Sequence, residues 1–339
     1  MEPVYCLAIS NQATRCFRHG KVPVFKKIRR KMIRKIIIIF ALFLFYSCSL
    51  KKQDEVVPIQ DDIPQEETVI FDKWVLTQYS DVSGNQALCY SLVDNENGNL
   101  ILIDGGWTEN AETVRSIIKN NGNHVKSWFL THYHSDHVGA FNELYEEYRD
   151  KIDTVYVTPL TWEDFEPVYQ SYDSPEAFEK FLDITYSDDK IVPLNRGDEF
   201  NLGLFHVKIF NAYDQYVDMY AKDLINNCSL VIQFKTDDDS ILICGDLSSE
   251  ELSNYLIDTY GEELCSNIVQ PGHHGNWGPP ISFYEYVRPE IMLFDSPEWL
   301  MTGEEYDAMD LKAWCDENNI KIYDYSTAPN VINESDLDH

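Results

Sequence analysis

Residues 131–137 read THYHSDH and follow directly on an apolar segment, residues 125–130. Such a segment predicts a buried strand, and the residues after it fall in the loop at the strand's end. His132 and His134 can point the same way, while Asp136 and His137 follow around the turn. Imidazoles and a carboxylate at this density suit Zn²⁺, Mn²⁺ or Fe²⁺ better than Ca²⁺ or Mg²⁺. The stretch predicts a metal site, with an ordinary solvated loop as the alternative.

Three other apolar segments end in an acid or a histidine beside glycine. They are LILIDGG (residues 100–106), ILICGD (residues 241–246) and IVQPGHHG (residues 268–275). A single segment that ends in this way is typical of an ordinary turn. Several together can bring ligands from distant parts of a chain to one edge of a sheet. We therefore expect Asp246, His273 and His274 to join the histidine cluster. Asp104 should lie beside it and fix the tautomer of one imidazole, or else cap the following helix.

These motifs resemble the metallo-β-lactamase-fold hydrolases from about residue 71 to the early 300s. The resemblance rests first on the pattern His-x-His-x-Asp-His, residues 132–137. Three later phrases resemble the branch that includes the hydrolase domain of the DNA-uptake protein ComEC. They are NCSLV (residues 227–231), CGDL (residues 244–247) and GHHG (residues 272–275). The resemblance implies an α/β fold, an αββα sandwich with a binuclear metal site at the mouth between its two sheets.

The resemblance also implies a ligand set. The implied metal ligands are His132, His134, Asp136, His137, Asp246 and His273. Asp246 would bridge both ions and His273 would close the second site. Related lactamases and lactonases give the first ion a third histidine that this chain lacks, and Asn227, or less favourably Asn226, fits that place. An amide oxygen is a poorer soft ligand than imidazole, so the first site should bind its ion more weakly and favour a harder ion such as Mn²⁺. We expect two divalent ions, zinc or manganese.

Such a site has a defined chemistry. Two cations that share a carboxylate lower the pKa of the water between them and present hydroxide as the nucleophile. Asp136 is placed to orient that water or take its proton, and His274 to contact substrate or donate to the leaving group, unless it only packs behind the metals. We expect a hydrolase of phosphodiesters or other phosphoesters. A hydrolase of carbon esters, lactones or amides and a non-catalytic metal-holding module are the alternatives.

The apolar pattern outside these motifs predicts strands that come first and then alternate with helices, which suits a layered α/β architecture. The expected strands are residues 73–79, 86–93, 99–104, 125–131, 153–158, 198–210, 229–236, 240–245, 266–271, 290–295 and 320–325. The expected helices are residues 108–120, 138–149, 174–184, 249–259 and 309–317.

The N-terminus predicts an export signal. Residues 1–48 form the expected leader, whose first 31 residues read as translated upstream sequence with Met32 as the true start. A charged segment, about ten apolar residues and Cys48 then resemble a bacterial lipoprotein signal, with a plain membrane anchor as the alternative. Residues 49–68 predict a flexible tether and residues 69–339 the hydrolase domain. We expect an exported lipoprotein, anchored to a bacterial membrane through lipidated Cys48.

Charge is distributed unevenly in this chain of net charge −30. Residues 53–339 hold 56 of the 57 acidic residues but only 15 of the 27 basic ones. Such a body repels polyanions, so extended nucleic acid is not an expected partner. Trp107 and Trp277 adjoin the site loops and should line the substrate cleft, and residues 159–195 should form part of a lid. We expect a monomer that binds a small-molecule or cell-envelope phosphoester, with a small or cationic head group favoured by an aromatic, acidic mouth.

Overall fold

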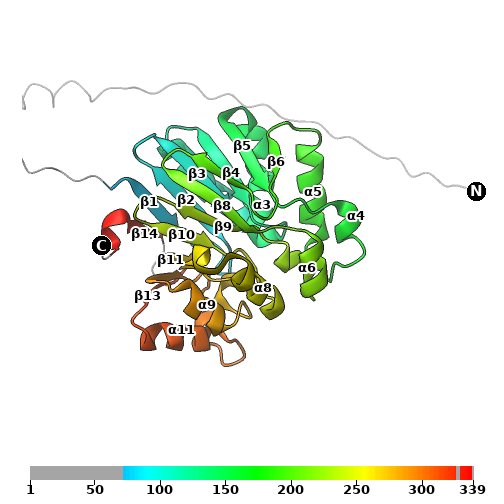
Figure 1. Cartoon of the computed structure of the whole chain (residues 1–339). Helices are drawn as coiled ribbons and strands as arrows, with labels where there is room; N and C mark the ends of the chain where they lie inside the picture. Colours follow the sequence, from blue (N-terminus) through cyan, green and yellow to red (C-terminus); the bar gives the residue numbers. More distant parts are fainter. Residues whose placement is uncertain (1–71, 326–328, 338–339) are drawn as a thin grey trace, which may run out of the picture. The chain divides into compact units, whose positions relative to one another are not determined.

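Two mixed seven-stranded sheets stack face to face in the computed structural model, which describes residues 72–325 and 329–337 (Figure 1). The first sheet has the order β14 (Asn330–Asn333), β1 (Trp74–Gln78), β2 (Cys89–Asp94), β3 (Asn99–Asp104), β4 (Val125–Leu130), β5 (Ile152–Val157) and β6 (Ile191–Pro193). The second has the order β13 (Lys321–Tyr323), β12 (Ile291–Leu293), β11 (Ile268–Gln270), β10 (Ser240–Ile243), β9 (Val231–Lys235), β8 (Phe205–Asn211) and β7 (Glu199–Leu202).

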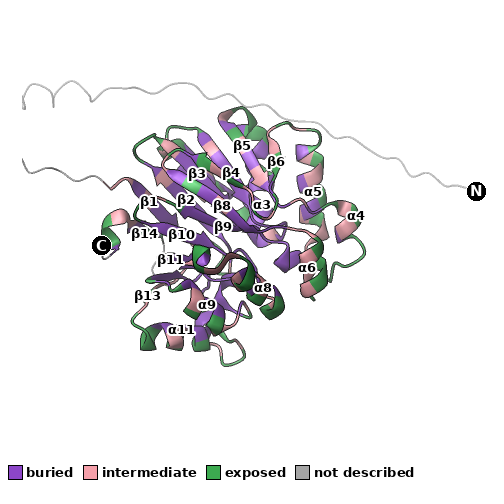
Figure 2. Cartoon of the chain, viewed as in Figure 1, coloured by how far each residue is buried: buried purple, intermediate pink, exposed green. Residues whose placement is uncertain are grey.

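An apolar core fills the space between the sheets. It draws on Leu76, Ile101 and Phe129 from the first sheet and on Ile232 and Phe234 from the second. The rings of Phe129 and Phe234 meet edge to face across the sandwich, with centroids 5.3 Å apart. Helices bury the outer faces as well, so most strand residues are buried on both sides (Figure 2). This explains why the strands appear in the sequence as nearly continuous apolar segments.

The longer helices cover the outer faces of the two sheets. On the first sheet lie α2 (Ala111–Asn120), α3 (Ser135–Tyr148) and α5 (Pro175–Thr185); on the second lie α8 (Glu250–Tyr260), α9 (Ile281–Val287) and α11 (Ala308–Glu317). In α2, the buried residues Val114, Ile117 and Ile118 recur at the helical spacing and face the sheet. The expected αββα sandwich is confirmed.

Several elements differ from the expected pattern. The single strand expected over residues 198–210 is a hairpin, β7 and β8, which turns at Gly203 with φ +59°. β14 pairs antiparallel with β1 and was not expected. α3 begins at Ser135, three residues earlier than expected, so Asp136 and His137 lie in its first turn.

The remaining helices are short, and they lie in the connections near the strand ends. They are α4 (Trp162–Phe165), α6 (Gln215–Tyr220), α7 (Leu224–Asn227) and α10 (Glu298–Thr302). Among the described residues, no helix is both long and apolar enough to cross a bilayer. The expected leader, Cys48 and the expected tether lie outside the described residues.

Candidate metal centre

The candidate ligands come from the ends of strands in both sheets. In the first sheet, β4 runs into His132 and His134, and α3 then supplies Asp136 and His137. In the second sheet, β10 is followed by Asp246 and β11 by the pair at residues 273–274. Because β10 and β11 are parallel, their following loops leave the sheet at the same edge. Residues more than a hundred positions apart thereby reach one rim of the sandwich.

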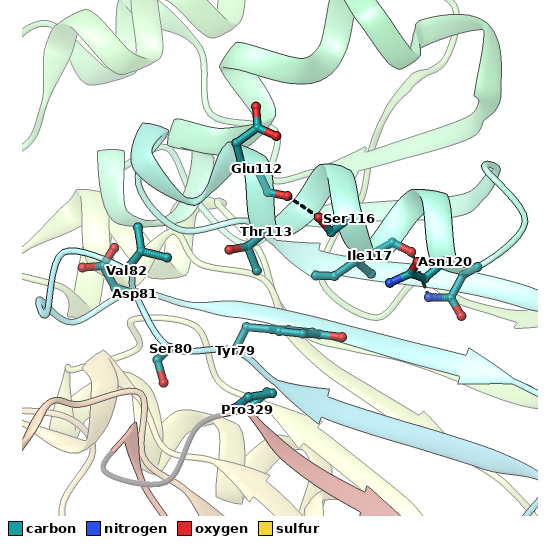
Figure 3. A pocket seen from close by; sticks show the side chains of 11 residues that line it. Tyr79, Ser80, Asp81, Val82, Glu112, Thr113, Ser116, Ile117, Asn120 and Pro329 are labelled. Atoms are coloured by element: carbon teal, nitrogen blue, oxygen red, sulfur yellow. Dashed lines mark hydrogen bonds between the residues drawn. The ribbon is translucent and has the colours of Figure 1, made fainter. Parts of the chain in front are cut away.

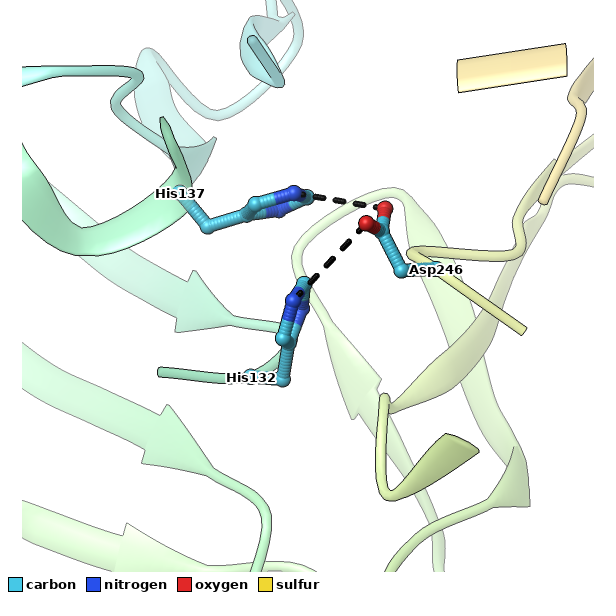
Figure 4. Close-up of side chains that lie close together, drawn as sticks. All are labelled: His132, His137 and Asp246. Carbon is cyan, nitrogen blue, oxygen red and sulfur yellow. Dashed lines mark ion pairs between the residues drawn. The ribbon is translucent and has the colours of Figure 1, made fainter. Parts of the chain in front are cut away.

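Asp246 lies at the centre of the cluster. Its Oδ1 is 3.2 Å from Nε2 of His137, and its Oδ2 is 3.8 Å from Nε2 of His132 and 3.5 Å from Nε2 of His274. Figure 4 shows His132, His137 and Asp246 pointing toward one another from three different segments. The carboxylate therefore faces imidazoles on both of its oxygens, as expected for a residue that bridges two ions.

Two groups of potential ligand atoms are close enough to hold an ion each. One group is His132, His137 and Asp246, and the other is Asp136, His137 and His274. Within the described part of the chain, four of these atoms are buried without a hydrogen-bond partner: Nε2 of His132, of His137 and of His274, and Oδ1 of Asp246. Burying a polar atom without a hydrogen-bond partner costs free energy, and the rare atoms of this kind are often found at functional sites. The donor set and its unpaired atoms fit divalent cations that accept nitrogen and oxygen ligands.

Neighbouring side chains fix the orientation of two of the imidazoles. Asp104 accepts hydrogen bonds from Nδ1 of His137 at 2.7 Å and from the backbone and hydroxyl of Thr131 at 2.7 and 2.6 Å. With Nδ1 bonded to Asp104, Nε2 is the nitrogen of His137 that faces Asp246 and is available to a metal. Ser229 Oγ lies 3.2 Å from Nδ1 of His132 and accepts from the backbone N–H of Asp246 at 3.0 Å. Ser229 lay inside a quoted sequence motif, yet nothing in the sequence assigned it this contact.

His134 is held by a residue that sequence reasoning missed. Its Nε2 lies 2.9 Å from Oδ1 of Asp173, which is buried. Nδ1 is therefore the nitrogen left for a metal. Asp173 belongs to the acid-rich segment expected to form a lid, but composition alone could not single it out among that segment's carboxylates.

The two adjacent histidines have exchanged the expected places. His274 is buried, and its Nε2 lies 3.2 Å from Oδ2 of Asp136, inside the second ligand group. His273 is a quarter exposed; its Nδ1 donates to the carbonyl of Asn276 at 2.6 Å, and its Nε2 is 4.0 Å from Oδ2 of Asp246. Among the described residues, His274 rather than His273 is placed to close the second site. His273 lies at the mouth, where we had expected His274.

The asparagine expectation is corrected in a similar way. Asn227 Oδ1 accepts from the backbone N–H groups of Ser248 and Ser249, and its Nδ2 donates to the carbonyl of Asp223. Asn227 is thus occupied in tying its own helix to the segment of Ser248 and Ser249 and is not available as a ligand. Asn226, the less favoured alternative, has a buried Oδ1 without a hydrogen-bond partner and lines the cleft.

Unusual backbone conformations let these loops turn sharply at the site. Gly245 has φ +54°, and a Cβ there would lie 2.8 Å from Cβ of Ser229, so the turn before Asp246 requires glycine. His273 and His274 have φ values of +52° and +58°. Residues other than glycine rarely adopt this left-handed backbone conformation, and those that do are often found at functional sites.

Burial and charge shift the pKa values of the cluster in opposite directions. Burial would lower the pKa of His274, but Asp246 and Asp136 outweigh it and raise the pKa to about 10. Burial and the neighbouring His137 hold the pKa of His132 well below its ordinary value. Burial opposes ionisation of Asp246, yet His274 and His137 bring its pKa well below the ordinary value. Nearby, burial raises the pKa of Asp295 to about 7.

A cleft of about 660 Å³ opens beside these residues. Its walls include both tryptophans expected there, Trp107 and Trp277, together with Tyr172 of the expected lid segment. A second cavity of about 700 Å³ shares none of its lining residues, and no described histidine lines it (Figure 3). It lies between α2 and the loop that follows β1. The chemistry therefore belongs to the first cleft.

Comparison with known proteins agrees with this architecture. The sequence model of the metallo-beta-lactamase superfamily matches residues 83–213. No curated protein sequence matches the chain. The metallo-beta-lactamase fold protein YhfI from Bacillus subtilis is 10% identical with a TM-score of 0.50, over 77% of this chain and 100% of that one. CmlA, a diiron β-hydroxylase from Streptomyces venezuelae, is 11% identical with a TM-score of 0.50, over 78% of this chain and 55% of that one.

At these identities the solved structures show the fold alone. Proteins of this superfamily usually bind two divalent metals and are usually hydrolases, although CmlA shows that the fold also carries a hydroxylase. The ligand groups described above lie at the rim of a fold of that kind. The chain has the metallo-beta-lactamase fold, and its residues 83–213 match the sequence model of that superfamily.

Proposed function

We propose that this protein is a binuclear-metal-dependent hydrolase of phosphodiesters or other phosphoesters. One observation carries the proposal: buried imidazoles and carboxylates from both sheets converge on Asp246, and several of their metal-binding atoms have no other partner. A structural ion alone would not need a 660 Å³ cleft opening onto its ligands.

The two close ligand groups share His137, and we assign it to the second ion. His132 through Nε2 and Asp246 would then hold the first ion, joined by His134 through Nδ1, which lies outside both close groups, with Asn226 as an oxygen ligand. Asp136, His137 and His274 would hold the second ion, with Asp246 shared between the two. When bound, two such cations supply an activated water and stabilise the charge that develops on the leaving oxygen.

The chain's own residues then position the reaction. Asp136 Oδ1 lies 4.0 Å from Nε2 of His137, and its position beside the shared carboxylate suits it to orient a water or take its proton. His273, at the mouth, is placed to contact substrate. In the reaction, the oxygen of water forms a new P–O bond, the P–O bond to the leaving alcohol breaks, and the proton of water passes to that alcohol.

The ligand chemistry favours phosphoesters over carbon esters. In this assignment the first ion has two imidazoles and an amide rather than three imidazoles, and a harder donor set suits a harder ion such as Mn²⁺. Mn²⁺ prefers oxygen-rich ligands, and a phosphoester offers two non-bridging oxygens to a pair of cations. The resemblance to the ComEC-like branch supports the same assignment.

A substrate panel tests the proposal. Protein purified without added metal is assayed with Mn²⁺ or Zn²⁺ against bis(p-nitrophenyl) phosphate, p-nitrophenyl phosphate, nitrocefin and a lactone. We expect turnover of one or both phosphoesters. Turnover confined to nitrocefin or the lactone would support the carbon-ester alternative. Metal binding without any turnover would support the metal-holding module.

Export, tethering and partners belong to the same proposal. We infer that the protein is exported, lipidated at Cys48 and anchored to a bacterial membrane, where as a monomer it meets a small or cell-envelope phosphoester. The signal-like sequence and the acidity of residues 53–339 support this. Incorporation of a labelled fatty acid into the wild-type protein but not into Cys48→Ala is the expected result; equal labelling of both would contradict it.

A further inference from the structure

The cleft carries an aromatic wall, which we define as Trp277, Trp299 and Tyr306. The ring centroids of Trp277 and Tyr306 are 5.7 Å apart, and those of Trp299 and Tyr306 are 5.6 Å apart. The ring planes of these pairs meet at 57° and 65°. The three rings therefore present faces in different directions, as a corner does, rather than one flat stack.

Two of the three rings of the aromatic wall are exposed, and hydrogen bonds hold the wall in place. The side chains of Trp277 and Trp299 are 56% and 45% exposed. The backbone N–H of Trp277 donates to Oδ1 of Asp307, and the backbone N–H of Asp307 donates back to Oδ1 of Asn276 at 3.2 Å. Large rings that a cleft keeps open to water indicate a surface for a ligand.

Two tryptophans of the cleft, Trp299 and Trp107, already bond their indole N–H groups to the protein. Nε1 of Trp299 donates to the carbonyl of Gly84 at 3.0 Å, and Nε1 of Trp107 donates to the carbonyl of Gln86 at 2.8 Å. With these donors satisfied, both indoles can offer only their ring surfaces. An indole face is electron-rich and attracts cations more strongly than any other side-chain ring.

The charge of the cleft points to the same kind of ligand. Of the residues that the structure describes, no lysine or arginine lines it, whereas Asp223 does, as do the candidate ligands Asp136 and Asp246. A substrate's phosphate would be met by the cations at the metal centre. Away from that centre, a second anionic group would find no basic partner along this wall. A cationic group would find the electron-rich rings of this wall, in a cleft that Asp223 also lines.

We propose that the aromatic wall binds the quaternary ammonium head group of a zwitterionic phosphodiester, a choline-type ester. The inference rests on the proposed function for the phosphate half of that substrate only. The head group would be held by cation–π attraction, and the ester bond would lie toward Asp246. The wall therefore selects among phosphoesters by the charge of their head groups.

A matched pair of substrates tests this inference. p-Nitrophenyl phosphocholine is compared with p-nitrophenyl 3,3-dimethylbutyl phosphate, which has the same shape but a neutral carbon in place of the charged nitrogen. We expect kcat/KM to be about tenfold higher for the choline ester, since a cation–π contact adds roughly that factor. The ratio should fall toward one in Trp277→Ala and Trp299→Ala and stay higher in Trp277→Phe. Tyr186→Ala, at an 85% exposed ring outside the cleft, should leave the ratio unchanged.

Equal kcat/KM values for the two esters in the wild-type protein would overturn the inference while leaving the phosphoesterase proposal intact. If neither ester is hydrolysed, a binding measurement tests the inference. Choline should change the tryptophan fluorescence of chelator-treated protein at concentrations where 3,3-dimethylbutan-1-ol does not, and Trp277→Phe should reduce that change. Equal responses to the two compounds would show an apolar surface without charge selection and would also overturn the inference.

Discussion

A single carboxylate, Asp246, faces the imidazoles of His132, His137 and His274 within 3.8 Å. Replacing it with alanine removes one ligand from each proposed ion and leaves the three imidazoles without their shared counter-charge. We expect Asp246→Ala to lose phosphoester hydrolysis and bound metal together, as measured by turnover and by elemental analysis. Asp238→Ala, at an exposed carboxylate, is the matched control. Full activity in Asp246→Ala would refute its assignment as the bridging residue.

The exchanged places of His273 and His274 give a second prediction. His274→Ala should lose the second ion, because His274 belongs to a buried ligand group. His273→Ala should keep close to the wild-type metal content and lower turnover, because His273 lies at the mouth. Metal content and kcat/KM of the two variants, measured side by side, separate these roles. The reverse pattern would restore His273 as the ligand.

At the scale of residues, the motifs showed which residue types form the site but not which way each side chain points. His132, Asp136 and His137 could be located because they lie within six positions after an evident strand. His273 and His274 could not be told apart, since adjacent side chains diverge and their left-handed φ values decide which one turns inward. For the same reason Asn227 was favoured over Asn226: sequence spacing does not show which amide is already occupied by backbone hydrogen bonds.

Among the structural elements, the connection between β5 and β6 has the closest link to the site. Tyr133, between two candidate ligands, stacks on Phe178 of α5 with ring centroids 4.2 Å apart. Asp173, just before α5, holds His134. The strands were predictable because a strand that is buried on both faces of its sheet consists mostly of apolar residues, and such a segment can be recognised in the sequence. This connection was not, because its contacts with the site come from single side chains without a periodic pattern.

The hydrogen bond between Asp173 and His134 gives a prediction for this connection. Asp173→Asn keeps the side chain's shape but weakens the acceptor that orients His134, so metal affinity should fall by about 10–100-fold. Chelator competition measures the affinity, and circular dichroism checks the fold. Asp183→Asn, at an exposed position of the same connection, should bind metal as the wild type does. Unchanged affinity in Asp173→Asn would show that His134 does not depend on Asp173.

At the scale of the whole molecule, the metal centre joins the two sheets. Its ligands come from loops of both, so bound ions would link the layers that the apolar core already holds together. The sandwich itself was predictable from the sequence motifs and the order of strands. β14 was not, since a four-residue edge strand near the end of the chain has too little pattern to be recognised.

Protons and metals compete for the same atoms, and this couples the stability of the molecule to pH. The pKa of His274 in the metal-free protein is about 10, above its ordinary value of 6.5, because Asp246 and Asp136 outweigh the effect of burial. A raised pKa stabilises the metal-free fold fully below pH 6.5, and this contribution is lost as the pH rises toward 10. A bound metal requires a neutral imidazole, so the metal-loaded protein lacks this dependence.

Stabilisation by metal should therefore grow with pH. Between pH 6.5 and 8.5 we expect the gap in unfolding free energy between metal-loaded and chelator-treated protein to widen by roughly 2 kcal/mol. In a body of this size that is a shift of several degrees in Tm. Thermal unfolding of both forms at the two pH values measures it, with His274→Gln as the variant in which the widening should shrink. A gap that stays constant with pH would show that protons do not occupy the metal-binding atoms of the metal-free protein.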